Sequence, residues 1–234
     1  ETAGVYVMSL NTERKTPMPI VIVGHVDHGK STLVGRLLHD TGSLPEGKLE
    51  EVQKACERRG VAMEWSFLLD AFQAERDQAI TIDTTQIWFS TPYRPYIIID
   101  APGHREFLKN MVSGAAQADA AILVVDAKDG LQEQTKRHAY LLSLLGMRQV
   151  AIAVNKMDMV NYDDAVFAKV SRDVDKYLKS IGVTAKHIVP ISAREGAMIA
   201  SHSDKMHWYK GKTLTEVLDA FEVDSPPLTR ALRF

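Results

Sequence analysis

Short apolar runs alternate with longer amphipathic stretches along most of this chain. Runs of about four to eight apolar residues indicate buried strands, and apolar residues spaced three and four apart indicate helices. Strands are predicted at residues 20–23, 84–91, 96–100, 120–126, 150–155 and 187–191. Helices are predicted at residues 32–38, 49–59, 65–78, 105–118, 131–145, 163–181 and 213–221. Near-continuous apolar strands that alternate with helices predict an α/β fold, a parallel sheet covered on both faces.

One stretch departs from this rhythm. Residues 42–83 carry no strong strand pattern and contain two of the predicted helices. An excursion of this length between a helix and the next strand is usually functional. The strand predicted at residues 84–91 alternates apolar and polar residues, so we expect one of its sides to be exposed.

Composition narrows the class of protein only moderately. The 234 residues include 45% hydrophobic and 25% charged residues, which is ordinary for a globular protein. The net charge of -2 argues against a broad surface for nucleic acid. Cys56 is the single cysteine, so a disulfide within the chain and a multi-cysteine zinc site are excluded. No apolar run approaches the length of a membrane span, and we expect a cytoplasmic protein without membrane contact.

The strongest chemical signal is the motif G-x-x-x-x-G-K-S, which runs from Gly24 to Ser31 between a predicted strand and a predicted helix. This context is typical of a phosphate-binding P-loop. Gly24 and Gly29 let consecutive backbone N–H groups face a phosphate, and the helix N-terminus adds partial positive charge. Lys30 should reach the β- and γ-phosphates, and Ser31 should bind Mg²⁺. A chance glycine turn is the alternative.

Ligands of parallel α/β sheets bind at the carboxyl ends of the strands, so the turns after Val23, Ile99, Val154 and Ile191 should share one edge. The turn after Ile99 begins Asp100-Ala101-Pro102-Gly103-His104. Asp100 could hold Mg²⁺ through a water molecule, and Gly103 could donate its N–H to a γ-phosphate. In isolation, the same sequence is a common turn.

The turn Asn155-Lys156-Met157-Asp158 indicates which nucleotide base would be bound. The Asp158 carboxylate could accept hydrogen bonds from N1–H and the 2-amino group of guanine, whereas adenine would leave it unpaired. A helix-capping turn is the alternative, left open by this motif alone. In the turn Ser192-Ala193-Arg194, a backbone N–H could meet the guanine O6.

Thr81 lies within the long excursion, in Ala79-Ile80-Thr81-Ile82-Asp83. Its hydroxyl could bind Mg²⁺ and its N–H could contact a γ-phosphate, but only while that phosphate is present. An ordinary strand threonine is the alternative.

Taken together, the P-loop, Thr81, Asp100-Ala-Pro-Gly103-His104, Asn155-Lys-Met-Asp158 and Ser192-Ala193 resemble the G domain of translation-factor-class GTPases, over about residues 20–221. The resemblance implies the three-layer P-loop NTPase fold, with a six-stranded, mostly parallel sheet and helices on both faces. It implies the reaction GTP + water → GDP + phosphate, with GTP, GDP and Mg²⁺ as ligands.

Residue roles follow from the same resemblance. It implies that His104, with Lys30 and Thr81, serves catalysis, and that His104 positions the attacking water behind an apolar gate of Val26 and Ile80. Metal ligands would be Ser31, Thr81 and Asp100, and the class places a monovalent-cation ligand at the position of Asp27. The implied nucleotide-binding residues are Gly24, His25, Val26, Asp27, His28, Gly29, Lys30, Ser31, Thr32, Gly103, Asn155, Lys156, Asp158, Ser192, Ala193 and Arg194.

Within this class, residues 82–89, 137–146 and 199–203 look like the GTP-hydrolysing large subunit of bacterial sulfate adenylyltransferase. This finer resemblance implies a small catalytic adenylyltransferase subunit as partner and a coupling of GTP hydrolysis to sulfate activation. The alternative is a tRNA-carrying elongation or release-type factor, whose partners are tRNA or the ribosome. An ATP-dependent kinase is a further rival that the Asn155–Asp158 motif disfavours.

The resemblance also divides the chain. It implies an N-terminal extension at residues 1–19, a G domain at 20–223 and, at 224–234, a linker into a β-barrel domain. The G domain would contain switch I at about residues 42–83 and switch II at about 100–118. Ala79 and His207 depart from the glycine and proline that are usual in the class.

Overall fold

A computed structural model describes residues 16–78, 86–99 and 117–222 of the chain. Its sheet has six strands. Their spatial order is β2 (Gln86–Ser90), β3 (Pro95–Ile99), β1 (Met18–Gly24), β4 (Ala120–Asp126), β5 (Val150–Asn155) and β6 (Ala185–Pro190). Strand β2 pairs antiparallel with β3, and every other neighbouring pair is parallel. The predicted six-stranded, mostly parallel sheet is confirmed.

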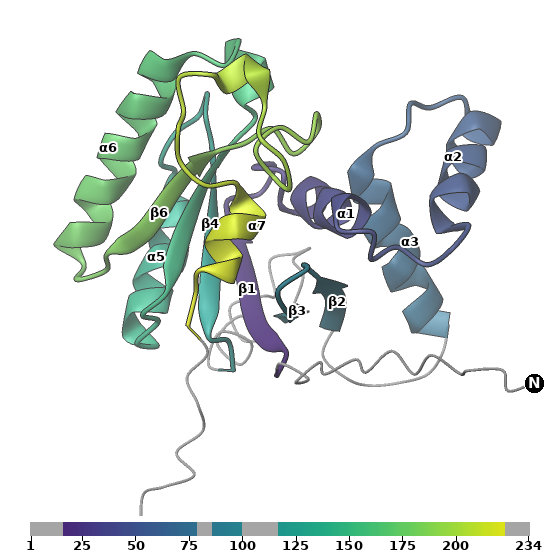
Figure 1. Cartoon of the computed structure of the whole chain (residues 1–234), viewed down its shortest axis with the longest axis horizontal. Coiled ribbons are helices and arrows are strands. Elements are labelled where there is room, and N and C mark those ends of the chain that lie inside the picture. Colours follow the sequence, from purple (N-terminus) through teal and green to yellow (C-terminus); the bar gives the residue numbers. More distant parts are fainter. Residues whose placement is uncertain (1–15, 79–85, 100–116, 223–234) are drawn as a thin grey trace, which may run out of the picture.

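Helices cover both faces of this sheet. The helices are α1 (Lys30–Asp40), α2 (Lys48–Arg59), α3 (Trp65–Gln78), α5 (Glu133–Leu144), α6 (Asp164–Ser180) and α7 (Leu214–Asp219). Two short 3₁₀ turns are η1 (Met157–Val160) and η2 (Asp204–Met206). Figure 1 shows the strands running between α5 and α6 on one side and α1, α2 and α3 on the other. This is the three-layer arrangement that the sequence predicts.

Most predicted elements are present, with ends that shift by no more than two residues. The shift at the start of β1 is informative, because the strand begins at Met18 and the predicted domain boundary after residue 19 falls inside it. Met18 is fully buried, and Pro19 is tolerated because proline can stand at the beginning of a strand. The predicted helix at 105–118 and the predicted extension at 1–19 lie mostly outside the described residues. The predicted linker at 224–234 lies wholly outside them.

Burial follows the position of each strand in the sheet. Every residue of β4 and β5 is buried, as expected for central strands with helices on both faces. Strand β2 lies at the edge, where buried Ile87 and Phe89 alternate with Trp88, which is 53% exposed. The prediction that one side of this strand is exposed is confirmed.

The described part of the excursion, residues 42–78, forms a two-helix unit beside α1. Val52, Cys56 and Leu68 form a small separate core between α2 and α3. Cys56 is therefore a packing thiol. Helix α1 approaches this unit closely at Gly35, where a Cβ atom would collide with the Trp65 carbonyl oxygen. Within the described segments, no helix is both long and apolar enough to cross a membrane.

Candidate functional site

The loop between β1 and α1 has the backbone conformation that its glycines predict. Gly24 and Gly29 have φ angles of +154° and +83°. A Cβ at Gly24 would collide with Val124 O, and one at Gly29 would lie 2.5 Å from Asn155 Nδ2. Both positions therefore need glycine for conformation and for space. The N-terminus of α1 faces the loop, as a phosphate-binding turn requires.

Lys30 folds back across this loop. Its Nζ donates hydrogen bonds to Gly24 O at 3.0 Å and to His25 O at 2.7 Å. Burial lowers the pKa of Lys30 to about 8, against the opposing attraction of the Asp27 carboxylate. The ammonium group is thus held at the loop with less solvation than a surface lysine, which suits it to bind an anion.

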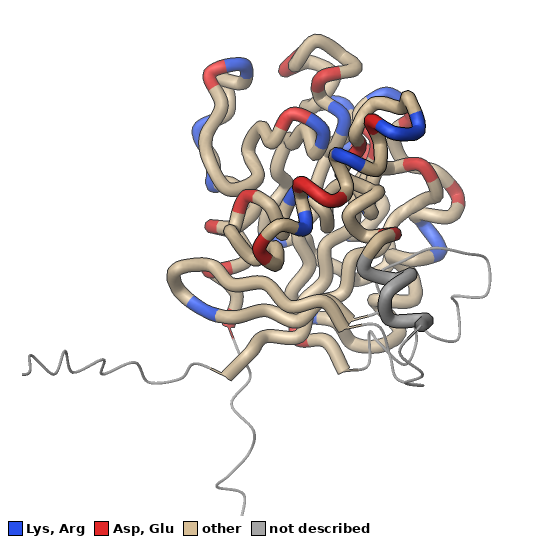
Figure 2. Tube along the Cα trace, turned by 90° about the vertical axis from the view of Figure 1, so that its right-hand side faces the viewer, with Lys and Arg blue, Asp and Glu red and all other residues tan. Residues whose placement is uncertain are grey.

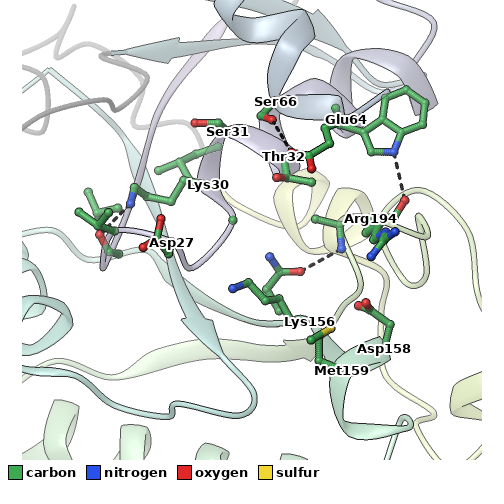
Figure 3. A pocket seen from close by; sticks show the side chains of 18 of the residues that line it. Asp27, Lys30, Ser31, Thr32, Glu64, Ser66, Lys156, Asp158, Met159 and Arg194 are labelled. Carbon is green, nitrogen blue, oxygen red and sulfur yellow. Dashed lines mark hydrogen bonds between the residues drawn. The ribbon is translucent and has the colours of Figure 1, made fainter. Parts of the chain in front are cut away.

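A cavity of about 720 Å³ opens beside this loop. Residues from three distant strand-end turns line it: the P-loop, the turn after β5 and the turn after β6. Figure 3 shows Lys30, Ser31 and Thr32 across the cavity from Asp158 and Arg194. The fourth predicted turn, with Asp100, Gly103 and His104, lies outside the described residues, as does Thr81.

Twelve predicted site residues line the cavity, and three described ones do not. The twelve are Gly24, Val26, Asp27, Gly29, Lys30, Ser31, Thr32, Asn155, Lys156, Asp158, Ala193 and Arg194. The three described residues that do not line it are His25, His28 and Ser192. His28, for example, is buried against β4, with Nδ1 3.3 Å from Val124 O.

Asn155 joins the three turns directly. Its side-chain Nδ2 donates to His28 O in the P-loop at 2.9 Å, and its Oδ1 accepts from the Ala193 N–H at 2.9 Å. Asn155 is only 1% exposed. Because both polar atoms of one buried amide are bonded to different loops, this side chain fixes their relative positions.

Ser192 orients the carboxylate that the sequence assigns to guanine. Its hydroxyl donates to Asp158 Oδ1 at 2.6 Å. The Ser192 N–H donates to Ala197 O at 3.1 Å, and the Ala193 N–H is bonded to Asn155. The two amides expected near guanine O6 are thus bonded within the protein in this structure, and that contact stays a prediction.

Asp126, at the end of β4, is a site residue that the sequence reasoning missed. Its Oδ2 pairs with Lys156 Nζ at 2.8 Å, and its Oδ1 accepts from the Lys128 and Asp129 amides. Burial by itself would raise the pKa of Asp126, but these hydrogen bonds hold it below its usual value. An acid at the end of an apolar strand was the available signal, the same one that drew attention to Asp100.

Helix α5 supplies two side chains to the site that the sequence analysis did not predict. Gln134 Oε1 accepts from His25 Nδ1 at 2.5 Å and from the Val26 amide at 3.3 Å. His138 lines the cavity, and burial lowers its pKa to about 4, so its ring is neutral near neutral pH. The apolar spacing of this segment predicted only a helix, and nothing local marked these side chains.

The described residues contain no cluster of three or more histidine, cysteine or acidic side chains that could hold a metal ion. The hydroxyl-bearing Ser31 nevertheless lies on the cavity next to Lys30. Mg²⁺ in phosphate sites keeps several waters and takes few protein ligands, so this donor set fits such an ion. The other two predicted ligands, Thr81 and Asp100, lie outside the described residues.

Fold and site together define a P-loop nucleotide-binding domain of the GTPase type. Residues 15–224 match the family described as the elongation factor Tu GTP binding domain, and the chain belongs to that family.

The curated relatives include elongation factor 1-alpha of Thermococcus gammatolerans, which is 48% identical over 221 residues. The protein of the same name from Pyrococcus horikoshii is 47% identical over 221 residues. Each alignment covers 94% of this chain and 51% of the relative, so the chain spans about half of their length.

Solved structures give the same fold. The crystal structure of Sup35 complexed with GDP matches with a TM-score of 0.64 at 24% identity, covering 90% of this chain and 46% of that one. Sup35 complexed with GMPPNP matches with a TM-score of 0.63 at 25% identity, covering 92% and 47%.

The two hydrogen bonds made by the Asn155 side chain yield a prediction about stability. Asn155→Ala leaves His28 O and the Ala193 N–H unpaired in a buried site, so we expect a loss of about 2–4 kcal/mol in the free energy of unfolding. Urea unfolding without nucleotide measures it. Ser180→Ala is the control, since this exposed hydroxyl donates only to Tyr177 O, within its own helix. Equal unfolding midpoints for Asn155→Ala and the parent would refute the structural role.

Proposed function

We propose that this chain binds GTP and GDP in the cavity and hydrolyses GTP to GDP and phosphate. The observation that carries the proposal is one cavity bounded by the P-loop, Asn155-Lys156-x-Asp158 and Ala193, with Asn155 bonded to both other turns. The family to which the chain belongs is described as a GTP-binding domain, which supports the same conclusion.

The phosphates would lie at the P-loop end of the cavity. The backbone N–H groups after Gly24 and the N-terminus of α1 provide donors and partial positive charge there. Lys30, now bonded to two carbonyls, would transfer its hydrogen bonds to the phosphate oxygens. Mg²⁺, held by Ser31 with Thr81 and Asp100, would neutralise charge on the β- and γ-oxygens when bound. Asp27 would be the ligand of a monovalent cation.

The guanine base would lie at the opposite end. Asp158, oriented by the Ser192 hydroxyl, would accept from guanine N1–H and the 2-amino group. The Lys156 stem, fixed by the Asp126 ion pair, would cover one face of the ring. Adenine offers neither donor to Asp158, so the carboxylate would keep only its bond from the Ser192 hydroxyl and ATP would bind weakly.

Hydrolysis needs little covalent chemistry from the protein. Lys30 would spread charge from the β- and γ-oxygens, which is most of what phosphoryl transfer requires. His104 would orient the attacking water, and Val26, 51% exposed at the cavity, would form one side of its apolar gate with Ile80. The P-loop contains no arginine to act as a finger, so intrinsic turnover should be slow.

For the whole protein, we propose a translation factor of the tRNA-carrying elongation type. The reported curated relatives bear the name elongation factor 1-alpha, which favours this function over sulfate activation. On the side that Figure 2 shows, Lys and Arg positions lie among Asp and Glu positions, so the described residues on this side offer no uniformly basic face for tRNA.

The large subunit of sulfate adenylyltransferase is a second candidate. Its only support is the sequence resemblance of residues 82–89, 137–146 and 199–203. Two assays separate the candidates. The protein loaded with GTP is tested for binding to aminoacyl-tRNA by gel shift, and for GTPase stimulation by an adenylyltransferase subunit from the same source. Binding of tRNA without such stimulation supports the translation factor, and the reverse result supports the sulfate-activating subunit.

Base recognition gives a direct test. Asp158→Asn should weaken GTP binding at least about a hundredfold and improve binding of xanthosine triphosphate, because an amide can donate where the carboxylate accepts. Nucleotide titrations by calorimetry measure both affinities. Asp163→Asn, at the exposed N-cap of α6, is the matched control and should leave both unchanged. Unaltered GTP affinity in Asp158→Asn would end the assignment.

The pKa of Lys30 predicts how binding depends on pH. With a pKa of about 8, the free protein loses this charge as the pH rises, whereas bound phosphates favour the protonated amine. Phosphates are already fully ionised there. GDP affinity should therefore fall about tenfold between about pH 7 and about pH 9, with proton uptake on binding. Calorimetry in two buffers measures the uptake.

Lys30→Arg is the control for this effect. Its guanidinium stays charged throughout the range, so the pH dependence should disappear even if the affinity is lower. A parent protein whose GDP affinity is flat over this range would contradict the lowered pKa.

A further inference from the structure

A fourth segment lines the cavity besides the three strand-end turns. Residues 62–66 comprise the end of the connection between α2 and α3 and the first two residues of α3, and all five contribute to the cavity wall. Figure 3 shows Glu64 and Ser66 beside Thr32, between the P-loop and Arg194. The α2–α3 unit therefore closes one side of the pocket in which the nucleotide is proposed to bind.

Trp65 bonds this segment to the turn after β6. Its indole Nε1 donates to Arg194 O at 3.0 Å, and the bond is drawn beside Arg194 in Figure 3. The Arg36 guanidinium lies over the same indole, 4.8 Å from the ring centroid, and Arg36 Nη1 also reaches Arg194 O at 3.4 Å. Arg36 is itself held by Asp40 at 2.7 Å. One backbone carbonyl thus receives donors from α1 and α3.

Two glycines make room for this arrangement. A Cβ at Gly35 would collide with the Trp65 carbonyl, and a Cβ at Gly196 would collide with the Arg36 guanidinium. Gly35 therefore lets α1 approach the Trp65 backbone, and Gly196 leaves room for the Arg36 guanidinium that lies over the indole.

The Trp65–Arg194 hydrogen bond is linked through the turn after β6 to the part of the cavity where the guanine base is proposed to bind. Arg194 follows Ala193, whose N–H is held by Asn155, and Asn155 in turn holds the P-loop at His28 O. The turn that is expected to enclose guanine is thus bonded at Ala193 by Asn155 and at Arg194 by Trp65, and both of these side chains belong to residues that line the cavity. Moving either the turn or residues 62–66 outward requires the indole hydrogen bond to break.

We propose that Trp65 is a positioning residue that slows the release of guanine nucleotide by holding the α2–α3 unit against the turn after β6. The inference rests on the proposed binding of GTP and GDP in this cavity. The competing explanation is that Trp65 only packs against the small α2–α3 core, with which it is in contact. Packing alone would affect stability without a specific effect on nucleotide release.

Trp65→Phe separates these explanations. Phenylalanine keeps an aromatic ring over Arg36 and His39 but lacks the indole N–H. If the hydrogen bond is lost in the transition state for release, the dissociation rate should rise about two- to tenfold. Stopped-flow displacement of fluorescent GDP by excess GDP measures that rate. The association rate and the unfolding midpoint without nucleotide should change little.

Trp208→Phe is the matched control. It also removes an indole N–H donor, here to Tyr162 O at 2.9 Å, but Trp208 does not line the cavity. Its dissociation rate should equal that of the parent. Equal acceleration in both variants would indicate general loosening and overturn the inference.

Two further results decide the matter. Parent and Trp65→Phe proteins that bind fluorescent GDP but release it at the same rate would overturn the inference and leave the proposed function intact. A parent protein that binds no guanine nucleotide would overturn both.

The fluorescence of Trp65 gives a second test. The chain has three tryptophans, so the double variant Trp88→Phe/Trp208→Phe leaves Trp65 as the single fluorescent indole. Its emission should change when GDP binds, and an unchanged spectrum at saturating GDP would also overturn the inference.

Discussion

The geometry of the site depends on one buried amide. Asn155 is the only described residue whose side chain bonds both the P-loop and the turn after β6, and it can do so because an amide carries a donor and an acceptor. The parallel sheet brings the three turns to one edge, but strands alone leave loop tips free to move. The amide converts that proximity into a fixed cavity, and Gly29 packs against it.

The sheet and the main site turns could be predicted because their signals are local. Continuous apolar runs such as residues 120–126 predicted buried central strands, and the P-loop glycines predicted a backbone that only glycine adopts with ease. Ends were less predictable: the apolar run predicted a strand beginning at residue 20, whereas pairing with β3 extends β1 to Met18. Long-range pairing outweighed the local preference there.

Residues that make hydrogen bonds to distant parts of the chain have no such local signal in the sequence. Gln134 reaches the P-loop from a position more than 100 residues away in sequence, and Trp65 reaches Arg194 over 129 residues. Neither belongs to a motif that a single sequence can reveal. The finer resemblance to a sulfate-activating subunit depended on short segments such as residues 137–146, most of which lie in helix α5, whereas the similarity over most of the chain is to elongation factor 1-alpha.

Neighbouring residues in the turn after β5 divide two tasks between them. Asn155 maintains the architecture, whereas Asp158 faces the cavity and is supported separately, by the Ser192 hydroxyl. In the proposed binding mode, base selectivity therefore depends on Asp158, a side chain that does not itself hold the three turns together. Such a scaffold lends itself to re-engineering for an unnatural nucleotide, so that one copy of the protein could be driven independently of every native GTPase in a cell.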